Sequence, residues 1–146
     1  MQRRTLLKAG LALWVSALTQ RVWAAVRPEA FAKKDMNEAM RELFGSDGYT
    51  EDSSIQFKAP EIAENGAVVP LSASYKGAAQ QIAFFVEQNP QPLAAMFTLG
   101  ATGSAKVSTR IKMGKSSIVH AVLQTAEGQI IGTAKEVKVT IGGCGG

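Results

Sequence analysis

Residues 107–113 read Val-Ser-Thr-Arg-Ile-Lys-Met, a stretch in which every second side chain is apolar or β-branched. Successive side chains of a β-strand point to opposite faces, so this alternation predicts a strand with one face in a core and one in solvent. The same period of two recurs around residues 54–58, 69–75 and 137–141. These runs indicate that strands rather than helices form most of the fold.

Clusters of turn-forming residues separate the alternating runs, for example Glu64-Asn65-Gly66 and Glu127-Gly128. Pro70 has no backbone N–H to donate, so we expect it on an edge strand or at a β-bulge. Short strands with frequent turn signals are typical of a β-sandwich, so we predict an all-β, immunoglobulin-like architecture. The sequence predicts about seven strands, at residues 54–59, 67–76, 81–87, 94–99, 105–113, 117–125 and 129–141.

One α-helix is predicted before the strands, at residues 28–44. Pro28 suits the first turn of a helix, and Gly45 suits the left-handed residue that ends one. An apolar stripe at three- and four-residue spacing supports the helix and comprises Met36, Ala39, Met40, Leu43 and Phe44. We expect this stripe to pack on the sandwich.

Two predicted strands, 81–87 and 117–125, carry apolar side chains on both faces. A sandwich strand of this kind needs a cover on its outer face. The pattern leaves open whether the N-terminal helix or a second polypeptide supplies it. His120 lies between apolar neighbours and is predicted to be a hydrogen-bonded packing residue. For a second polypeptide, the predicted contact residues are Phe84, Phe85, Ile118 and Val122.

Composition excludes several classes of function. The 146 residues are 46% hydrophobic, which suits one domain with a buried core. The first 24 residues hold four of the 16 basic and none of the 12 acidic residues, so residues 25–146 are formally neutral and nucleic-acid binding is not indicated. With one Cys and one His, the sequence offers no internal disulfide, no CxxC redox pair and no Cys/His metal cage. We therefore expect no bound metal.

The first 24 residues have the pattern of an export signal. Arg3-Arg4 precedes Leu6-Leu7-Lys8, and an apolar stretch at residues 9–18 follows. That stretch is too short to span a bilayer comfortably, and the paired arginines indicate the twin-arginine route. We expect residues 1–24 to be a twin-arginine signal peptide and the mature protein to be periplasmic, folded on export and without a membrane anchor. An ordinary secretory signal or an uncleaved anchor is the alternative.

The last five residues read Gly-Gly-Cys-Gly-Gly. Glycine visits most of backbone space, so the sequence predicts a flexible tether that carries the thiol of Cys144 beyond the domain. No base, cation or helix N-terminus adjoins this thiol in the sequence, which argues against a self-sufficient nucleophile and therefore against an enzyme. The thiol has the character of a handle to which other proteins attach a group.

Two other roles for Cys144 remain. A structural periplasmic sandwich would use its lone cysteine for an intermolecular disulfide. A copper chaperone would need several soft ligands close together, and no Met or His lies near Cys144 in the sequence. The first of these is the stronger alternative.

Four stretches of the sequence resemble one protein family. They are Lys-Val-Thr-Ile-Gly-Gly-Cys-Gly-Gly at residues 138–146, the segment 60–66 with Val69-Pro70, Asn89-Pro90 with Pro92, and Val-Ser-Thr-Arg-Ile at 107–111. The family is SoxY, the Y subunit of the Sox thiosulfate-oxidising system. The loops around residues 77–79 and 100–105 are shorter than in the family pattern.

The resemblance implies a sulfur carrier built as a helix and β-sandwich over residues 25–141. Cys144 would be the covalent attachment point, on a swinging arm formed by Gly142, Gly143, Gly145 and Gly146. The implied partners are a SoxZ-type β-sandwich subunit in a heterodimer, a haem cytochrome, a dimanganese hydrolase and, in some systems, a sulfane dehydrogenase. The carrier itself would bind no cofactor, because the haem and manganese belong to those partners.

Overall fold

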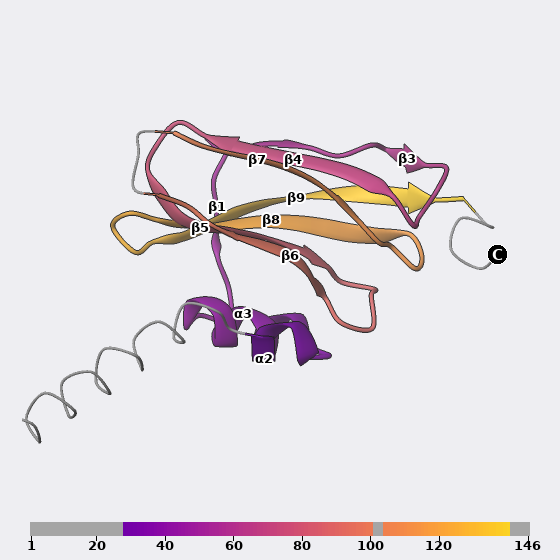
Figure 1. Ribbon diagram of the computed structural model, residues 1–146, viewed down its shortest axis with the longest axis horizontal. Coiled ribbons are helices and arrows are strands. Elements are labelled where there is room, and N and C mark those ends of the chain that lie inside the picture. The colour runs from indigo at the N-terminus through magenta and orange to yellow at the C-terminus, as the bar shows by residue number, and fades with distance from the viewer. Residues whose placement is uncertain (1–27, 101–103, 141–146) are drawn as a thin grey trace, which may run out of the picture.

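Two β-sheets lie face to face in the computed structural model, with two short helices against the outer face of one sheet (Figure 1). The structure describes residues 28–100 and 104–140. The helices are α2 (Pro28–Ala32) and α3 (Met36–Phe44). The strands are β1 (Thr50–Glu51), β2 (Gln56–Lys58), β3 (Ile62–Ala63), β4 (Val69–Tyr75), β5 (Ala79–Val86), β6 (Leu93–Thr98), β7 (Ala105–Ile111), β8 (Ser117–Thr125) and β9 (Ile130–Val139). Among the described residues, no helix has the length and apolar character needed to cross a membrane.

The predicted all-β sandwich is confirmed, since each of the seven predicted strands has a counterpart. The larger sheet has the order β1-β9-β8-β5-β6, and the smaller sheet has the order β2-β4-β7. The alternation does not predict β1 and β3, because two residues are too few to show a period. Both pair with β9 in parallel, whereas the other strand pairs are antiparallel.

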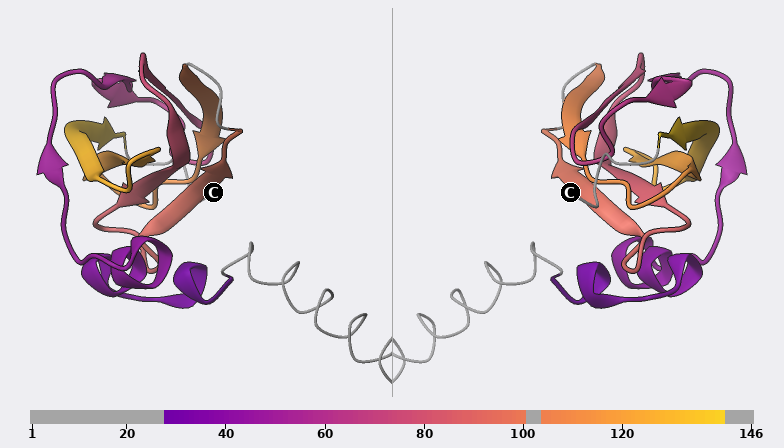
Figure 2. Two further views of the ribbon diagram at one scale, coloured as in Figure 1. Left: turned by 90° about the vertical axis from the view of Figure 1, so that its left-hand side faces the viewer. Right: turned by 90° about the vertical axis from the view of Figure 1, so that its right-hand side faces the viewer.

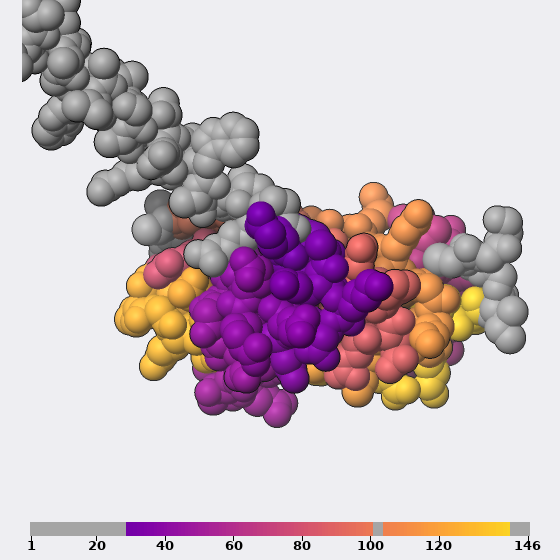
Figure 3. All heavy atoms as spheres, turned by 90° about the horizontal axis from the view of Figure 1, so that it is seen from below, coloured from indigo at the N-terminus to yellow at the C-terminus, as the bar shows by residue number. Residues whose placement is uncertain are grey.

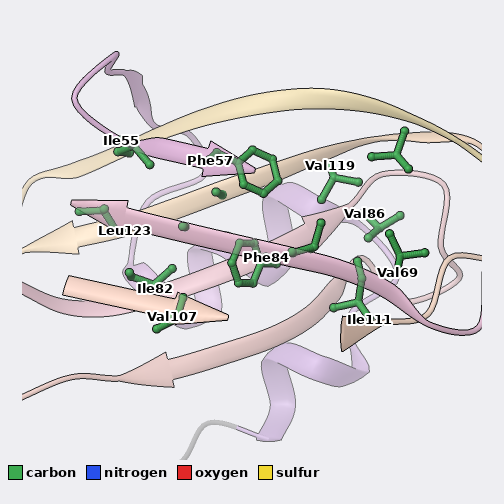
Figure 4. Close-up of a cluster of buried hydrophobic side chains, with 14 of the residues drawn as sticks. Ile55, Phe57, Val69, Ile82, Phe84, Val86, Val107, Ile111, Val119 and Leu123 are labelled. Atoms are coloured by element: carbon green, nitrogen blue, oxygen red, sulfur yellow. The ribbon is translucent and has the colours of Figure 1, made fainter. Parts of the chain in front are cut away.

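The sandwich core lies between the two sheets and is centred on Phe84 of β5 (Figure 4). The Phe84 side chain is 0% exposed, and its ring centroid lies 5.9 Å from that of Phe57 and 6.4 Å from that of Phe97. These rings come from both sheets, so Phe84 joins the two layers. Around them pack the alternating aliphatic side chains, among them Val69, Ile82, Val86, Val107, Ile111, Val119 and Leu123.

A second core lies on the outer face of the larger sheet, under the helices. Both side views place the helices beneath the two sheets (Figure 2), and the view from below shows them over the middle of this face (Figure 3). Phe85, the neighbour of Phe84, is 0% exposed here and lies 6.5 Å from the ring of Phe44. The buried members of this cluster are Ala30, Ala39, Met40, Leu43, Ala83, Phe85, Leu93 and Val122.

The chain's own helices therefore cover the double-sided strands, which settles the alternative that the sequence left open. The prediction that Phe84, Phe85 and Val122 contact a second polypeptide is wrong, because all three are 0% exposed within this chain. Phe84 faces the sandwich core, and the other two face the helices. Ile118 is 42% exposed and stays a prediction.

The predicted single helix is two helices. The break falls at residues 33–35, and Asp35 has the extended backbone of an N-cap, with its side chain accepting a hydrogen bond from the N–H of Glu38 at 3.1 Å. This contact starts α3 anew, because an Asp side chain satisfies an N–H that the first turn leaves without a partner. Gly45 ends α3 in the left-handed conformation with φ 74°, as expected.

Pro70 lies neither on an edge strand nor at a bulge, because β4 is the central strand of the smaller sheet. The sequence prediction is wrong for a local reason. Strand β2 pairs with β4 only from Ser72 to Ser74, so Pro70 has a partner strand on the β7 side alone. The missing N–H of proline therefore costs no ladder hydrogen bond on the open side.

We expect Phe85→Ala to lower the free energy of unfolding by about 3–5 kcal/mol, because it leaves a cavity between β5 and α3. Urea denaturation would measure the change. The control is Ile118→Ala, which alters a half-exposed side chain on the same outer face and should cost less than about 1 kcal/mol. Equal losses for the two variants would contradict the burial of Phe85 under the helix.

Candidate functional site

Strand β9 leads directly into the Gly-Gly-Cys-Gly-Gly segment, and hydrogen bonds on one edge hold its end to β3. The N–H of Lys138 donates to the carbonyl of Glu61 at 2.9 Å, and the N–H of Thr140 donates to the carbonyl of Ala63 at 3.2 Å. These bonds accompany the parallel pairing of Ile62 with Lys138 and of Ala63 with Val139. Strand β3 therefore holds the end of β9.

Two side-chain contacts complete the attachment. The N–H of Val139 donates to the hydroxyl of Ser116 at 2.9 Å, and the hydroxyl of Thr140 donates to the carbonyl of Glu64 at 3.1 Å. The end of β9 is thus held by residues from two separate segments, one before β4 and one before β8. The alternation pattern missed this arrangement, because it arises from pairing between residues distant in the sequence.

Exposed apolar side chains lie close to this end of β9. Ile62 is 61% exposed and pairs with Lys138, and Ile118 is 42% exposed and pairs with Glu136. Both residues therefore lie beside the last residues of β9, the strand that precedes the Gly-Gly-Cys-Gly-Gly segment. Ile118 is the one predicted contact residue that the structure leaves on the surface.

The predicted attachment residue Cys144 and the predicted arm residues Gly142, Gly143, Gly145 and Gly146 lie outside the described residues. Their roles stay predictions. Chain length still limits where the thiol can go, since Cys144 is four positions after Thr140 and this stretch spans at most about 14 Å. Thr140, the last described residue, is therefore the point from which the thiol can extend.

His120 lies in a hydrogen-bonded array on the outer face of the larger sheet. Its Nε2 is 2.6 Å from Oε1 of Glu87, and its Nδ1 is 2.8 Å from the hydroxyl of Tyr49. A carboxylate only accepts, so Nε2 donates to Glu87, and in the tautomer with the proton on Nε2 the Nδ1 atom accepts from Tyr49. This confirms His120 as a hydrogen-bonded packing residue, with partners 33 and 71 positions away in the sequence.

Tyr49 connects the segment after α3 to the sheet. Burial raises the pKa of its phenol, and the negative charges of Glu51 and Glu87 raise it further. The Tyr49 ring lies on Gly132, where a Cβ would come within 2.7 Å of the ring. A glycine is therefore required at position 132, and the protonated phenol remains a donor to His120.

Asp52 accepts two hydrogen bonds from Ser54, its neighbour two positions along the chain. The hydroxyl of Ser54 donates to Asp52 Oδ1 at 2.6 Å and the N–H of Ser54 donates to it at 2.8 Å, and together they hold the pKa of Asp52 below its usual value. This contact stabilises the turn before β2. Within residues 28–100 and 104–140, no three Asp, Glu, His or Cys side chains gather as metal ligands would.

A family model described as sulfur oxidation protein SoxY matches residues 40–144, from α3 through the sandwich to Cys144. The chain belongs to the SoxY family. The resemblance predicted from the sequence is confirmed, and with it the expectation that the chain is a sulfur carrier of a Sox system rather than an enzyme.

A solved structure supports the same family assignment. The sulfur carrier protein SoxY from Chlorobium limicola f thiosulfatophilum is 38% identical with a TM-score of 0.63, and the alignment covers 73% of this chain and 97% of that one. A superoxide reductase (neelaredoxin) variant from Ignicoccus hospitalis is 17% identical with a TM-score of 0.51, covering 70% and 87% of the two chains. At that identity the likeness shows the fold alone. No curated protein matched the sequence of this SoxY-family chain.

We expect Tyr49→Phe to lower the stability of the SoxY-family domain by about 1–2 kcal/mol, because Nδ1 of His120 loses its partner in a half-buried place. Because the pKa of Tyr49 is raised on folding, its stabilisation is present below the ordinary value near 10 and lost as pH rises above it. The difference between the two proteins should therefore shrink in alkaline solution. Denaturation at several pH values measures it.

The matched control is Tyr75→Phe, at the other tyrosine of the sequence, whose hydroxyl has no hydrogen-bond partner among the described residues. This variant should change stability by less than about 0.5 kcal/mol. A loss as large as that of Tyr49→Phe would mean that the phenol contributes through packing rather than through His120.

Proposed function

We propose that this chain is a periplasmic carrier that holds thiosulfate-derived sulfur on Cys144 and presents it to the enzymes of the Sox system. The observation that carries the proposal is the attachment of β9, whose end is held by four hydrogen bonds from Lys138, Val139 and Thr140. The one cysteine of the sequence follows four residues after Thr140, between two glycine pairs.

A carrier of this kind needs a fixed base and a thin, adaptable arm. The hydrogen bonds at Thr140 supply the fixed base. Gly142, Gly143, Gly145 and Gly146 supply an arm without side chains, which fits a narrow channel in an enzyme. Cys144 then reaches a partner's active site while the sandwich stays outside.

The chemistry follows from a thiol and thiosulfate. Forming an S–S bond between Cys144 and the outer sulfur of thiosulfate releases one proton from the thiol and two electrons, which the haem cytochrome accepts. Water then cleaves the bond between the outer sulfur and the sulfonate group, giving sulfate and a persulfide on Cys144. The dimanganese hydrolase performs this step, and in some systems a sulfane dehydrogenase oxidises the remaining sulfur.

In this function the haem and manganese belong to the partner proteins, and the chain itself carries only the covalent sulfur adduct. A SoxZ-type β-sandwich subunit completes the carrier as a heterodimer. Since helices α2 and α3 cover the middle of the outer face, this subunit binds elsewhere, and Ile118 is the remaining candidate contact.

The periplasmic location is supported by the first 24 residues. Their paired arginines, apolar stretch and the aliphatic Val22 and small Ala24 before position 25 fit a twin-arginine signal. That route exports folded proteins, so the carrier and its SoxZ-type subunit cross the membrane together.

We expect Cys144→Ser to leave the domain folded and to abolish thiosulfate oxidation, because the hydroxyl forms no disulfide-like bond to sulfur. Intact-mass measurement of the unaltered protein from the periplasm of thiosulfate-oxidising cells should show additions that match sulfur or sulfur-oxyanion groups and that a reductant removes. The serine variant should show none.

The competing role is an intermolecular disulfide in a structural sandwich. It predicts a mass equal to two joined chains before reduction, with no sulfur or sulfur-oxyanion addition, in cells that are oxidising thiosulfate. A folded serine variant that still supports thiosulfate oxidation would refute the carrier function outright.

We expect Gly143→Leu and Gly145→Leu to slow turnover by the partner enzymes by about tenfold or more, because branched side chains widen the arm and restrict its backbone. The control is the rate at which a small alkylating reagent modifies Cys144, which should stay nearly the same. Unchanged enzymatic turnover in both leucine variants would show that the arm does not enter a narrow channel.

A further inference from the structure

The outer face of the smaller sheet is basic and carries no carboxylate. Strands β2, β4 and β7 contain no Asp or Glu, and their outward side chains include Lys58, Lys106 and Arg110. The pairing registers place Lys58, Ser72 and Ser108 in one row across the sheet. Arg110 lies in the next row, opposite Pro70.

A groove of about 660 Å³ lies on this face between the cations. Its polar lining includes Ser72, Ser108 and Thr109, and Lys58 and Arg110 contribute from the two outer strands. The two prolines, Pro60 and Pro70, line it as well. The groove therefore has cationic sides and a lining of hydroxyls and apolar rings.

The two cations are available to a partner. Lys58 and Arg110 are exposed, and neither forms an ion pair with any residue in the described part of the chain. Clustered charge of one sign without nearby opposite charge produces a potential that attracts acidic surfaces. Lysines on edge strands also deter edge-to-edge pairing, but that role requires no groove between them.

The groove lies within reach of the arm. Pro60 is three residues from Ala63, a distance of at most about 11 Å along the chain. The carbonyl of Ala63 in turn accepts the N–H of Thr140 at 3.2 Å. Cys144 extends up to about 14 Å from Thr140, so a protein seated in the groove is close enough to receive the thiol.

We propose that this groove docks an acidic surface beside the active-site entrance of the enzyme that hydrolyses the adduct on Cys144. This inference rests on the proposed carrier function. A protein surface is the occupant because the groove is open and many times larger than a single oxyanion, and because Lys58 and Arg110 face it from strands on opposite sides of β4.

A second copy of the chain is the competing occupant. Several carboxylates lie on the helical side, among them Glu29, Asp35 and Glu38, and in Figure 1 the helices lie opposite β4 and β7. Contact between these two sides of neighbouring copies would join chains head to tail, in a ring or in an open filament. Sedimentation measures such self-association and distinguishes the two occupants.

The test is Lys58→Glu with Arg110→Glu, made in the complete carrier loaded with thiosulfate and assayed for sulfate release by the hydrolase. At low ionic strength we expect KM to rise by about tenfold or more with kcat unchanged, because the charge reversal weakens encounter and docking rather than chemistry. Added salt should raise the KM of the unaltered carrier and have little effect on the variant.

The matched control is Lys33→Glu with Lys34→Glu, which makes the same change in net charge beside the helices and should leave KM near its original value. The neutral pair Lys58→Gln with Arg110→Gln should give an intermediate KM, and its thermal unfolding shows whether the fold is kept.

Equal KM values for the groove variant and the helical control overturn the docking inference, as does an effect of the groove variant on self-association in sedimentation with no effect on KM. The carrier function has a separate readout. Loss of activity in Cys144→Ser together with an unchanged KM in the groove variant rejects the docking surface alone, whereas activity in Cys144→Ser rejects the carrier function itself.

Discussion

The structure depends on one strand that is buried on both faces. Phe84 and Phe85 are consecutive in β5, so their side chains point to opposite sides of the larger sheet, and both are 0% exposed. Phe84 requires the smaller sheet above it, and Phe85 requires helix α3 beneath it. Two layers of packing are thus fixed by a single dipeptide, and an exposed aromatic face is avoided without a partner protein.

Strand β9 connects this core to the arm. Ile131 and Val137 face the sandwich core, while the end of the strand is held by β3 and by Ser116. The rigidity of the core therefore extends to Thr140.

Local pattern predicted most of this fold, and the failures have physical reasons. Strand β7 was predictable because one buried face imposes a strict period of two, and the helical stripe was predictable for the same reason at a period of 3.6. The break at Asp35 was missed although Asp favours an N-cap over a helix interior, because the apolar stripe alone does not show where a helix is interrupted.

The sequence pattern could not predict contacts between residues that are distant in the sequence. Nothing local identifies β3 as the partner of β9, or distinguishes a helix from a second chain as the cover over Phe85, since either would present apolar side chains. Tyr49, Glu87 and His120 meet only because β5, β8 and the segment after α3 converge. The role predicted for the glycine-flanked Cys144 rests on local composition alone and on no tertiary contact, and it stays a prediction.

A thiol on a short arm changes what docking must achieve. Because hydrogen bonds hold Thr140 to the domain, Cys144 stays within about 14 Å of Thr140. For an enzyme that docks beside Thr140, as we propose, a tether of this length would give an effective thiol concentration in the millimolar range. Weak, charge-guided contact is then sufficient for delivery, and weak contact lets the carrier leave for the next enzyme. An exposed basic groove with no carboxylate among its lining residues is suited to such contact, because its charge speeds the encounter with an acidic surface.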